Sequence, residues 1–248
     1  PIHDRQKRVI GFGGRSLDGS EPKYLNSPET EIFEKGKNLF GLDKSSLSIR
    51  KKDYAVVVEG YFDVMALHDS GITNVVASLG TALSRNQITL LSRATDSKKI
   101  LLNFDSDNAG IRAANRAISE VENLAIQGQL DLRVLQLPSG KDPDEFLNDN
   151  SPSEYEALAA KSPIWMDWQI DQSLKDLDLS KSDQFQEAVS SLVSLLGKLP
   201  QTAIRTHYLQ KVAQRLSGGQ GRFALQLEED LRNQISGQRW HGRSKKID

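Results

Sequence analysis

The strongest constraint on the fold is an alternation of short apolar runs and helical patterns between residues 54 and 137. Four runs are short and apolar enough for strands buried on both faces; they lie at residues 55–58, 74–79, 100–104 and 132–137. The segments between them carry the apolar spacing of helices, at residues 62–68, 84–93 and 111–126. Ser84 and Gln87 form a capping-box pattern at the start of the second helix. This alternation predicts an α/β fold, in which helices flank a mainly parallel sheet.

The segments on either side follow different patterns. Residues 1–52 are rich in Gly, Pro, Asn and Ser, and residues 9–15 predict a strand that ends in a glycine turn. After about residue 150 the strand signals stop, and helical patterns predict a small bundle; they occupy residues 165–174, 185–196, 202–216 and 223–235. We therefore expect four parts: a basic α+β segment (1–52), the α/β part (53–148), a helical part (149–236) and a flexible basic tail (237–248).

Composition excludes several classes of protein. No apolar run approaches the roughly 18 residues of a membrane span. Cysteine is absent, so neither disulfides nor cysteine-ligated zinc are expected. The chain starts at Pro1 without a signal-peptide pattern, and we expect a cytoplasmic protein and a fragment of a longer one.

The formal net charge of -1 hides an asymmetry along the chain. Residues 1–52 hold eleven Lys or Arg and seven Asp or Glu, whereas residues 53–148 hold eight and thirteen. A basic segment beside an acidic one favours a polyanion bound next to a divalent cation.

Acidic residues follow three of the four expected strands. The three groups are Glu59 with Asp63, Asp105 with Asp107, and Asp142 with Asp144. Because the carboxyl ends of parallel strands meet at the edge where ligands bind, we expect these groups to converge. Carboxylate oxygens are the ligands that Mg²⁺ prefers. A single Asp after a strand is more often a helix cap, but three groups at equivalent strand ends favour a metal site.

The residues around these acids resemble the Toprim fold, which primases, type IA and type II topoisomerases, and some nucleases and repair proteins share. Residues 57–64 (VVEGYFDV) look like the primase version of its first motif, and residues 77–82 (ASLGTA) look like the segment after it. Residues 104–110 (FDSDNAG) and 140–144 (GKDPD) look like the later motifs.

The upstream segment narrows the resemblance to bacterial DnaG-type primases. Residues 8–15 (RVIGFGGR), 22–30 (PKYLNSPET) and 33–41 (FEKGKNLFG) resemble the DnaG polymerase core just before its Toprim subdomain. The resemblance covers about residues 1–150, and the helical part matches by architecture only.

The resemblance implies a set of site residues. Those expected to be catalytic are Glu59, Asp105 and Asp107. Those expected to bind metal are the same three with Asp63, Asp142 and Asp144. Those expected to contact nucleotide or nucleic acid are Arg15, Lys23, Asn26, Lys35 and Tyr61.

The implied activity is nucleotidyl transfer that depends on Mg²⁺, with Mn²⁺ as an alternative, and that makes short RNA primers on single-stranded DNA. The implied partners are the template, NTPs and the RNA primer, together with the replicative helicase and single-strand-binding protein through regions mostly outside this chain. We expect a monomer at bacterial replication forks, with an organellar location as the alternative.

Three parts of the full-length family are expected to be missing: the zinc-binding module, the first part of the polymerase subdomain and the helicase-binding domain. We therefore expect weak or no primer synthesis from this chain alone.

Two other functions stay open. One is a Toprim nuclease or topoisomerase fragment, although none of the five Tyr residues has a distinctive context for a topoisomerase. The other is a non-catalytic nucleic-acid-binding module with a structural metal ion.

Overall fold

A computed structural model describes residues 1–16, 24–80 and 82–244 of the chain. The chain divides into two compact units, Pro1–Trp165 and Met166–Asp248. Among the described residues, none of the helices combines the length and the apolar character that a membrane crossing requires.

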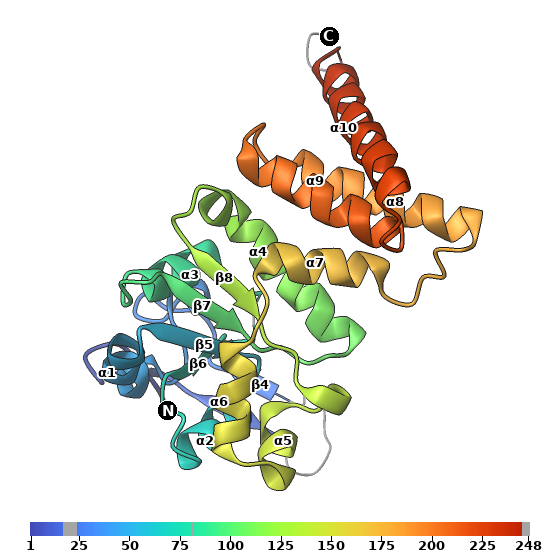
Figure 1. Cartoon of the computed structure of the whole chain (residues 1–248). Helices are drawn as coiled ribbons and strands as arrows, with labels where there is room; N and C mark the ends of the chain where they lie inside the picture. The colour runs from blue at the N-terminus through green and yellow to red at the C-terminus, as the bar shows by residue number, and fades with distance from the viewer. Residues whose placement is uncertain (17–23, 81, 245–248) are drawn as a thin grey trace. The chain divides into compact units, whose positions relative to one another are not determined.

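The first unit is built around a four-stranded parallel sheet with the strand order β6-β5-β7-β8 (Figure 1). The strands are β5 (Tyr54–Val58), β6 (Val75–Ala77), β7 (Lys99–Leu102) and β8 (Asp131–Val134). Val56 pairs with Val75 on one side and with Leu101 on the other, so β5 lies inside the sheet. The predicted parallel sheet is therefore confirmed, although its last three strands end earlier than the apolar runs suggested.

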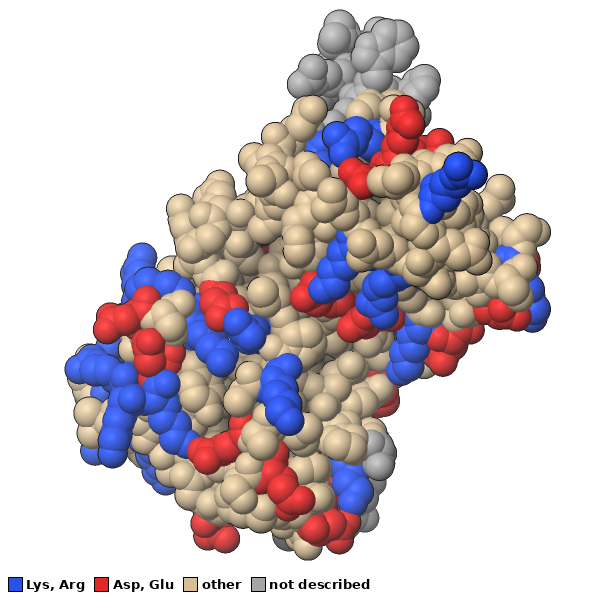
Figure 2. Space-filling model, viewed as in Figure 1, with Lys and Arg blue, Asp and Glu red and all other residues tan. Residues whose placement is uncertain are grey.

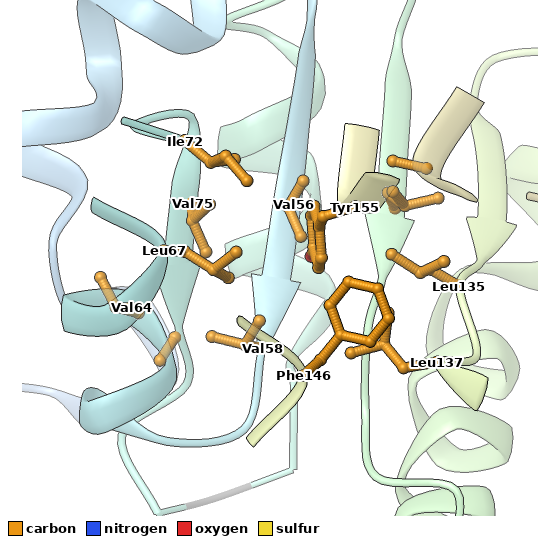
Figure 3. Packing of buried hydrophobic residues seen from close by; sticks show 13 residues of the cluster. Val56, Val58, Val64, Leu67, Ile72, Val75, Leu135, Leu137, Phe146 and Tyr155 are labelled. Atoms are coloured by element: carbon orange, nitrogen blue, oxygen red, sulfur yellow. The ribbon is translucent and has the colours of Figure 1, made fainter. Parts of the chain in front are cut away.

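Helices cover both faces of this sheet. On one face, side chains of α2 (Tyr61–Asp69), α5 (Pro143–Asp149) and α6 (Pro152–Ala160) pack on Val56, Val58 and Leu101 (Figure 3). Val57, Val76 and Leu102 alternate with these residues and are also fully buried. Because strand side chains alternate between faces, the second face is covered too. There α3 (Arg85–Ser92) and α4 (Asn108–Ile126) pack against β7 and β8.

Both edge strands of the sheet pair with a single residue from a flanking segment. Phe40 and Ala77 exchange two backbone hydrogen bonds, of 2.9 and 3.1 Å, along the free side of β6. On the other edge, Arg133 bridges to Ile164, and the N–H of Val134 donates to the carbonyl oxygen of Pro163 at 3.1 Å. The first unit therefore needs residues from both sides of the predicted 53–148 segment.

The N-terminal part consists of two small antiparallel pairs, a 3-10 turn and a helix. The pairs are β1 (Ile2–His3) with β2 (Val9–Gly11), and β3 (Gly13–Arg15) with β4 (Tyr24–Asn26). The single strand expected at residues 9–15 is thus two strands that are separated at Phe12. The turn is η1 (Lys35–Lys37) and the helix is α1 (Leu42–Lys52).

Helix α1 is not predicted by the sequence pattern. Its buried side includes Ser45, whose hydroxyl donates to the carbonyl oxygen of Val75 at 2.6 Å. A serine therefore occupies a position where an apolar residue would have completed the helical pattern. Its last turn carries Arg50, Lys51 and Lys52, and Figure 2 shows Lys and Arg side chains gathered over this helix.

The second unit is a helical bundle. Its helices are α7 (Trp165–Leu174), which starts at the end of the first unit, α8 (Ser182–Gly197), α9 (Ala203–Leu216) and α10 (Gly221–Ser244). Leu192, Val212 and Leu231 are buried where α8, α9 and α10 pack together. Lys211 pairs with Asp167 at 2.9 Å, and Arg215 pairs with Asp171, so two cations of α9 hold α7.

One helix and two boundaries differ from those expected. Helix α5 is not predicted by the sequence pattern. Helix α6 packs on the sheet through Tyr155 and Ala159, so the first unit extends to Trp165 and not to residue 148. Helix α10 continues to Ser244, so residues 237–244 are helical where the sequence predicts a flexible tail.

Candidate metal and nucleotide site

A cavity of about 370 Å³ lies at the carboxyl ends of the strands. Five of the six predicted metal ligands line it: Glu59, Asp63, Asp105, Asp142 and Asp144. Three of the predicted nucleotide contacts line it as well: Arg15, Asn26 and Tyr61. The structure therefore brings together eight residues that the sequence assigns to one site.

The pairing of β5 with β7 places Glu59 beside Asp105. The N–H of Asn103 donates to the carbonyl oxygen of Val57 at 2.8 Å, which extends the pairing to the end of both strands. The N–H of Asp105 then donates to Oε1 of Glu59 at 3.1 Å. We call the turn after β5 that carries Glu59 the first acidic turn, the turn after β7 that carries Asp105 the second, and the turn that carries Asp142 the third. The first and the second acidic turns are therefore directly hydrogen-bonded.

Two of the other acids also cap helices. Oδ1 of Asp107 accepts from the N–H groups of Ala109 and Gly110, both at 2.8 Å, at the start of α4. Oδ1 of Asp142 accepts from the N–H of Glu145 at 2.7 Å at the start of α5. The cap interpretation and the metal interpretation are compatible, because a carboxylate has a second oxygen. Asp107 is exposed and does not line the cavity.

Gly110 lets α4 start directly on the second acidic turn. A Cβ at this position would lie 2.0 Å from the carbonyl oxygen of Asp105, which is far inside contact distance. Only glycine fits there without displacing the Asp105 backbone.

Burial and mutual repulsion raise the pKa values of the carboxyl groups in the cavity. For Asp63, burial and the nearby charges of Asp142, Asp105 and Glu59 raise the pKa to about 7, against the hydrogen bond from the N–H of Gly60. Burial, and then Asp105, raise the pKa of Glu59, while burial, and then Asp142, raise that of Asp105. The site thus concentrates negative charge that a cation would stabilise.

This donor set fits a divalent metal ion. Hard cations take carboxylate oxygens, and Arg15 is the only Lys or Arg among the described residues that line the cavity. Across residues 1–16, 24–80 and 82–244, however, no group of three His, Cys, Asp or Glu side chains is already arranged to hold an ion. Metal binding therefore requires the carboxylates to turn toward a common point.

The basic and amide side of the cavity comes from the N-terminal part. The guanidinium of Arg15 lies 5.1 Å from the centre of the Phe62 ring, in a cation–π contact. Nδ2 of Asn26 donates to the carbonyl oxygen of Leu79 at 3.1 Å, and the Tyr61 hydroxyl donates to Oδ1 of Asn26. Asn26 therefore joins β4 to the turns that follow β5 and β6.

Of the two remaining basic residues, the structure describes only Lys35. Lys35 does not line the cavity; its N–H donates to Glu29, and its carbonyl oxygen accepts from Gln87. Lys23 lies outside the residues that the structure describes.

Sequence reasoning missed Gly60, Phe62, Ser78 and Gly80 as lining residues. Gly80 has a φ of +70°, and a Cβ there would lie 2.9 Å from Nδ2 of Asn26. The signal was present, since Ser78 and Gly80 belong to the ASLGTA segment, but no charge or metal chemistry marked them as site residues.

Comparison with known proteins agrees with this geometry. The sheet and the acidic cavity define a Toprim protein, and a family model described as Toprim-like matches residues 56–147. A model of the DNA primase catalytic core, N-terminal domain, matches residues 1–46. Together with the relatives and solved structures that follow, these matches show that the chain belongs to the family of bacterial DnaG-type DNA primases. The predicted family and fold are thereby confirmed.

Two relatives, both DNA primases, align over nearly the whole chain. The Synechococcus elongatus protein is 64% identical over 98% of this chain and 35% of its own length. The Synechocystis protein is 47% identical over 95% of this chain and 38% of its own length. The chain thus spans little more than a third of these relatives.

Solved structures match at the level of the fold and the sequence. A structure of the DnaG catalytic core is 36% identical, with a TM-score of 0.71, over 88% of this chain and 69% of that one. A DNA primase domain from Pseudomonas aeruginosa is also 36% identical, with a TM-score of 0.73, over 92% and 70%. Because the first unit ends at Trp165, matches this long extend into the helical unit.

One match corrects an expectation. A family model described as the DnaB-helicase binding domain of primase matches residues 166–221. The expectation that the helicase-binding domain lies outside this chain is therefore wrong for this segment. The sequence indicated only a helical bundle there, because helix spacing and glycine punctuation carry no signal of a partner.

Proposed function

We propose that this chain is the metal-binding core of a primase that synthesises short RNA primers on single-stranded DNA. The observation that carries the proposal is the cavity where Glu59, Asp63, Asp105 and Asp142 meet Arg15 and Asn26. The reaction is nucleotidyl transfer. The 3′-hydroxyl of one ribonucleotide attacks the α-phosphate of an incoming NTP and forms a P–O bond, while the bond from the α-phosphorus to the α–β bridging oxygen breaks. Pyrophosphate leaves with that oxygen, and the hydroxyl proton passes to solvent.

Mg²⁺ is the proposed ion, with Mn²⁺ as a substitute. Glu59, Asp105 and Asp107 would hold it, supported by Asp63, Asp142 and Asp144. When bound, such an ion supplies charge neutralisation for the phosphates and lowers the pKa of a coordinated hydroxyl. The protein's own part is to keep these carboxylates close together at the end of the sheet.

The basic side of the cavity would bind the nucleotide or the template. Arg15 offers a planar fork of donors that matches phosphate oxygens, and the exposed Phe62 ring beside it offers a surface for a base. Asn26, on the strand that pairs with that of Arg15, and Tyr61, next to Phe62 in α2, would position the ligand. Lys23 and Lys35 remain proposed contacts from the same basic segment.

The division of labour along the chain is also proposed. The basic segment would bind nucleotide and template, the sheet would carry the metal site, and the helical unit would contact the replicative helicase. The description of the family model at residues 166–221 supports the last of these roles. The ssDNA-bound DnaG catalytic domain, 36% identical with a TM-score of 0.70, supports the template role. We place a monomeric protein at the bacterial replication fork, in the cytoplasm, alongside single-strand-binding protein.

The test is primer synthesis by the full-length gene product on a single-stranded template with labelled NTPs. We expect short RNA products that require a divalent ion, and none from an Asp105→Asn variant that keeps the wild-type melting temperature. Wild-type synthesis by that folded variant would refute the site. Nicking of DNA without NTPs would point to a Toprim nuclease instead.

A further inference from the structure

A buried polar pair includes a residue two positions before Asp105 of the acidic cavity. Tyr155, on α6, is 1% exposed, and Asn103, which follows β7, is 2% exposed. The Tyr155 hydroxyl donates to Oδ1 of Asn103 at 2.7 Å. Figure 3 shows Tyr155 among the apolar side chains of the cluster, beside Val56 and Phe146.

Asn103 connects the ends of three strands. Its N–H donates to the carbonyl oxygen of Val57 in β5, and its Nδ2 donates to that of Leu135 just after β8, at 3.4 Å. Val57 lies two residues before Glu59, and Asn103 lies two residues before Asp105. The backbone of Asn103 therefore links the strands that lead to Glu59 and Asp105, and its side-chain amide ties this point to Leu135 and Tyr155.

The ring of Tyr155 connects Asn103 to the third acidic turn, which carries Asp142. Its centre lies 6.3 Å from the centre of the Phe146 ring, in an edge-on arrangement. Phe146 belongs to α5, the helix that Asp142 caps. Tyr155 thus contacts, through its hydroxyl and its ring, the segments that carry Asp105 and Asp142.

Burying this polar pair carries a desolvation cost that an apolar pair would avoid. Burying an amide and a phenol among valines and leucines is favourable only when both are hydrogen-bonded. The hydrogen bond is directional, so it fixes the orientation of the Asn103 side chain, which apolar packing alone would not fix.

We infer that Tyr155 is a positioning residue: through Asn103 and Phe146 it keeps the turns of Asp105 and Asp142 in place, so that their carboxylates can turn toward one metal ion. The inference rests on the proposed metal-dependent function of the cavity. It adds a residue of α6, a helix that packs on the sheet and lies outside every acidic motif in the sequence.

The first test is Mn²⁺ binding to the folded chain, followed by electron paramagnetic resonance. Outer residues that orient metal ligands change metal affinity by about tenfold or more, so Tyr155→Phe should weaken Mn²⁺ binding about tenfold. The matched control is Tyr208→Phe in the second unit. Tyr208 is also buried and hydrogen-bonded, to Asp167, and its loss should lower the melting temperature without changing Mn²⁺ affinity.

A second variant separates positioning from packing. Asn103→Ala, which also removes the bond to Leu135, should weaken Mn²⁺ binding at least as much as Tyr155→Phe. The double variant should be no weaker than Asn103→Ala alone, because the Tyr155 hydroxyl acts through Asn103. In the full-length protein, Tyr155→Phe should raise the Mg²⁺ concentration for half-maximal primer synthesis and leave the rate at saturating Mg²⁺ nearly unchanged.

The outcomes are distinct. The inference is overturned if both variants lower the melting temperature while Mn²⁺ affinity stays within about twofold of the wild type. A wild-type chain that binds no Mn²⁺ would overturn the metal site and this inference together. A wild-type protein that binds Mn²⁺ and is weakened by both substitutions, yet makes no primers, would refute only the proposed function.

Discussion

The N–H of Asp105 donates a hydrogen bond to Oε1 of Glu59, so the acidic turns after β5 and β7 are joined by the protein's own backbone. This bond partly offsets the repulsion between the two carboxylates, because an N–H donor favours the charged form of Glu59. It also leaves Glu59 with one oxygen committed to the fold and one for a ligand.

Glu59→Gln should separate charge from geometry. Glutamine keeps an Oε1 acceptor for the Asp105 N–H but removes the negative charge. We expect the metal-free chain to be at least as stable as the wild type, since repulsion with Asp105 is lost. Primer synthesis by the full-length protein should fall at least about 100-fold, because a metal ligand is lost. Thermal melting and a primer assay measure the two effects, and Glu228→Gln on α10 serves as the control. A large loss of stability would contradict this account.

The free energy of unfolding of the metal-free chain should depend on Asp63. Burial raises its pKa from 3.8 to about 7, so between these values the folded protein holds a proton that the unfolded chain has released. Stability from this group is therefore full below about pH 4, falls as the pH rises toward 7, and is flat above that. The total change is on the order of 4 kcal/mol.

Asp63→Asn should flatten much of this pH dependence, because asparagine does not titrate and still accepts from the Gly60 N–H. Urea unfolding at pH 5 and pH 8 provides the measurement. Asp178→Asn is the control, because Asp178 is exposed and hydrogen bonds from Ser180 lower its pKa. An unchanged slope in Asp63→Asn would show that other groups cause the pH dependence.

Gly110→Ala should disrupt the second acidic turn. The added Cβ would overlap the carbonyl oxygen of Asp105, so we expect a loss of about 3 kcal/mol of stability together with weakened Mn²⁺ binding. Gly197→Ala in α8 is the matched control, because a Cβ at that position would meet no atom within 4 Å. That control should gain about 0.5 kcal/mol from the better helix propensity of alanine. Chemical denaturation measures the free energy of unfolding of both variants, and equal stabilities would contradict the predicted clash.

Arg15→Ala should weaken binding of a single-stranded oligonucleotide to the chain. If Arg15 neutralises one phosphate, the slope of log affinity against log salt concentration should decrease by about one. Arg232→Ala, which removes an exposed partner of Glu228 in the second unit, should leave both quantities unchanged. Fluorescence anisotropy at several salt concentrations measures the affinity and its salt dependence. An unaltered slope would show that Arg15 does not contact the oligonucleotide.

The sequence predicted the sheet and the acidic site because both depend on local patterns. Val56, Val57 and Val58 form a short apolar run of the kind found in a strand that is covered on both faces. Glu59 and Asp105 follow such runs directly, and the parallel arrangement then forces them together. Ser84 and Gln87 form the predicted capping box, with the N–H of Ser84 donating to Gln87 at 2.8 Å.

What the sequence did not predict depends on contacts between distant segments. Helix α1 needs Ser45 to reach Val75, thirty positions away, and no local pattern encodes such a bond. Asp142 with Pro143 is a helix start that was assigned to the metal site alone, so α5 was missed. Asn103 looked like the polar end of an apolar run, and only its bonds to Val57, Leu135 and Tyr155 give it a role.

The bridges that Phe40 and Ile164 make to the two outer strands limit how this domain can be divided. A segment cut at residues 53 and 148 would keep every acidic motif but would expose unpaired N–H and C=O groups along β6 and β8. Open edges of this kind invite pairing with other chains, so the excised segment should aggregate. A transplantable Toprim module of this type therefore has to carry residues 40–164, and its borders are set by strand edges and not by sequence motifs.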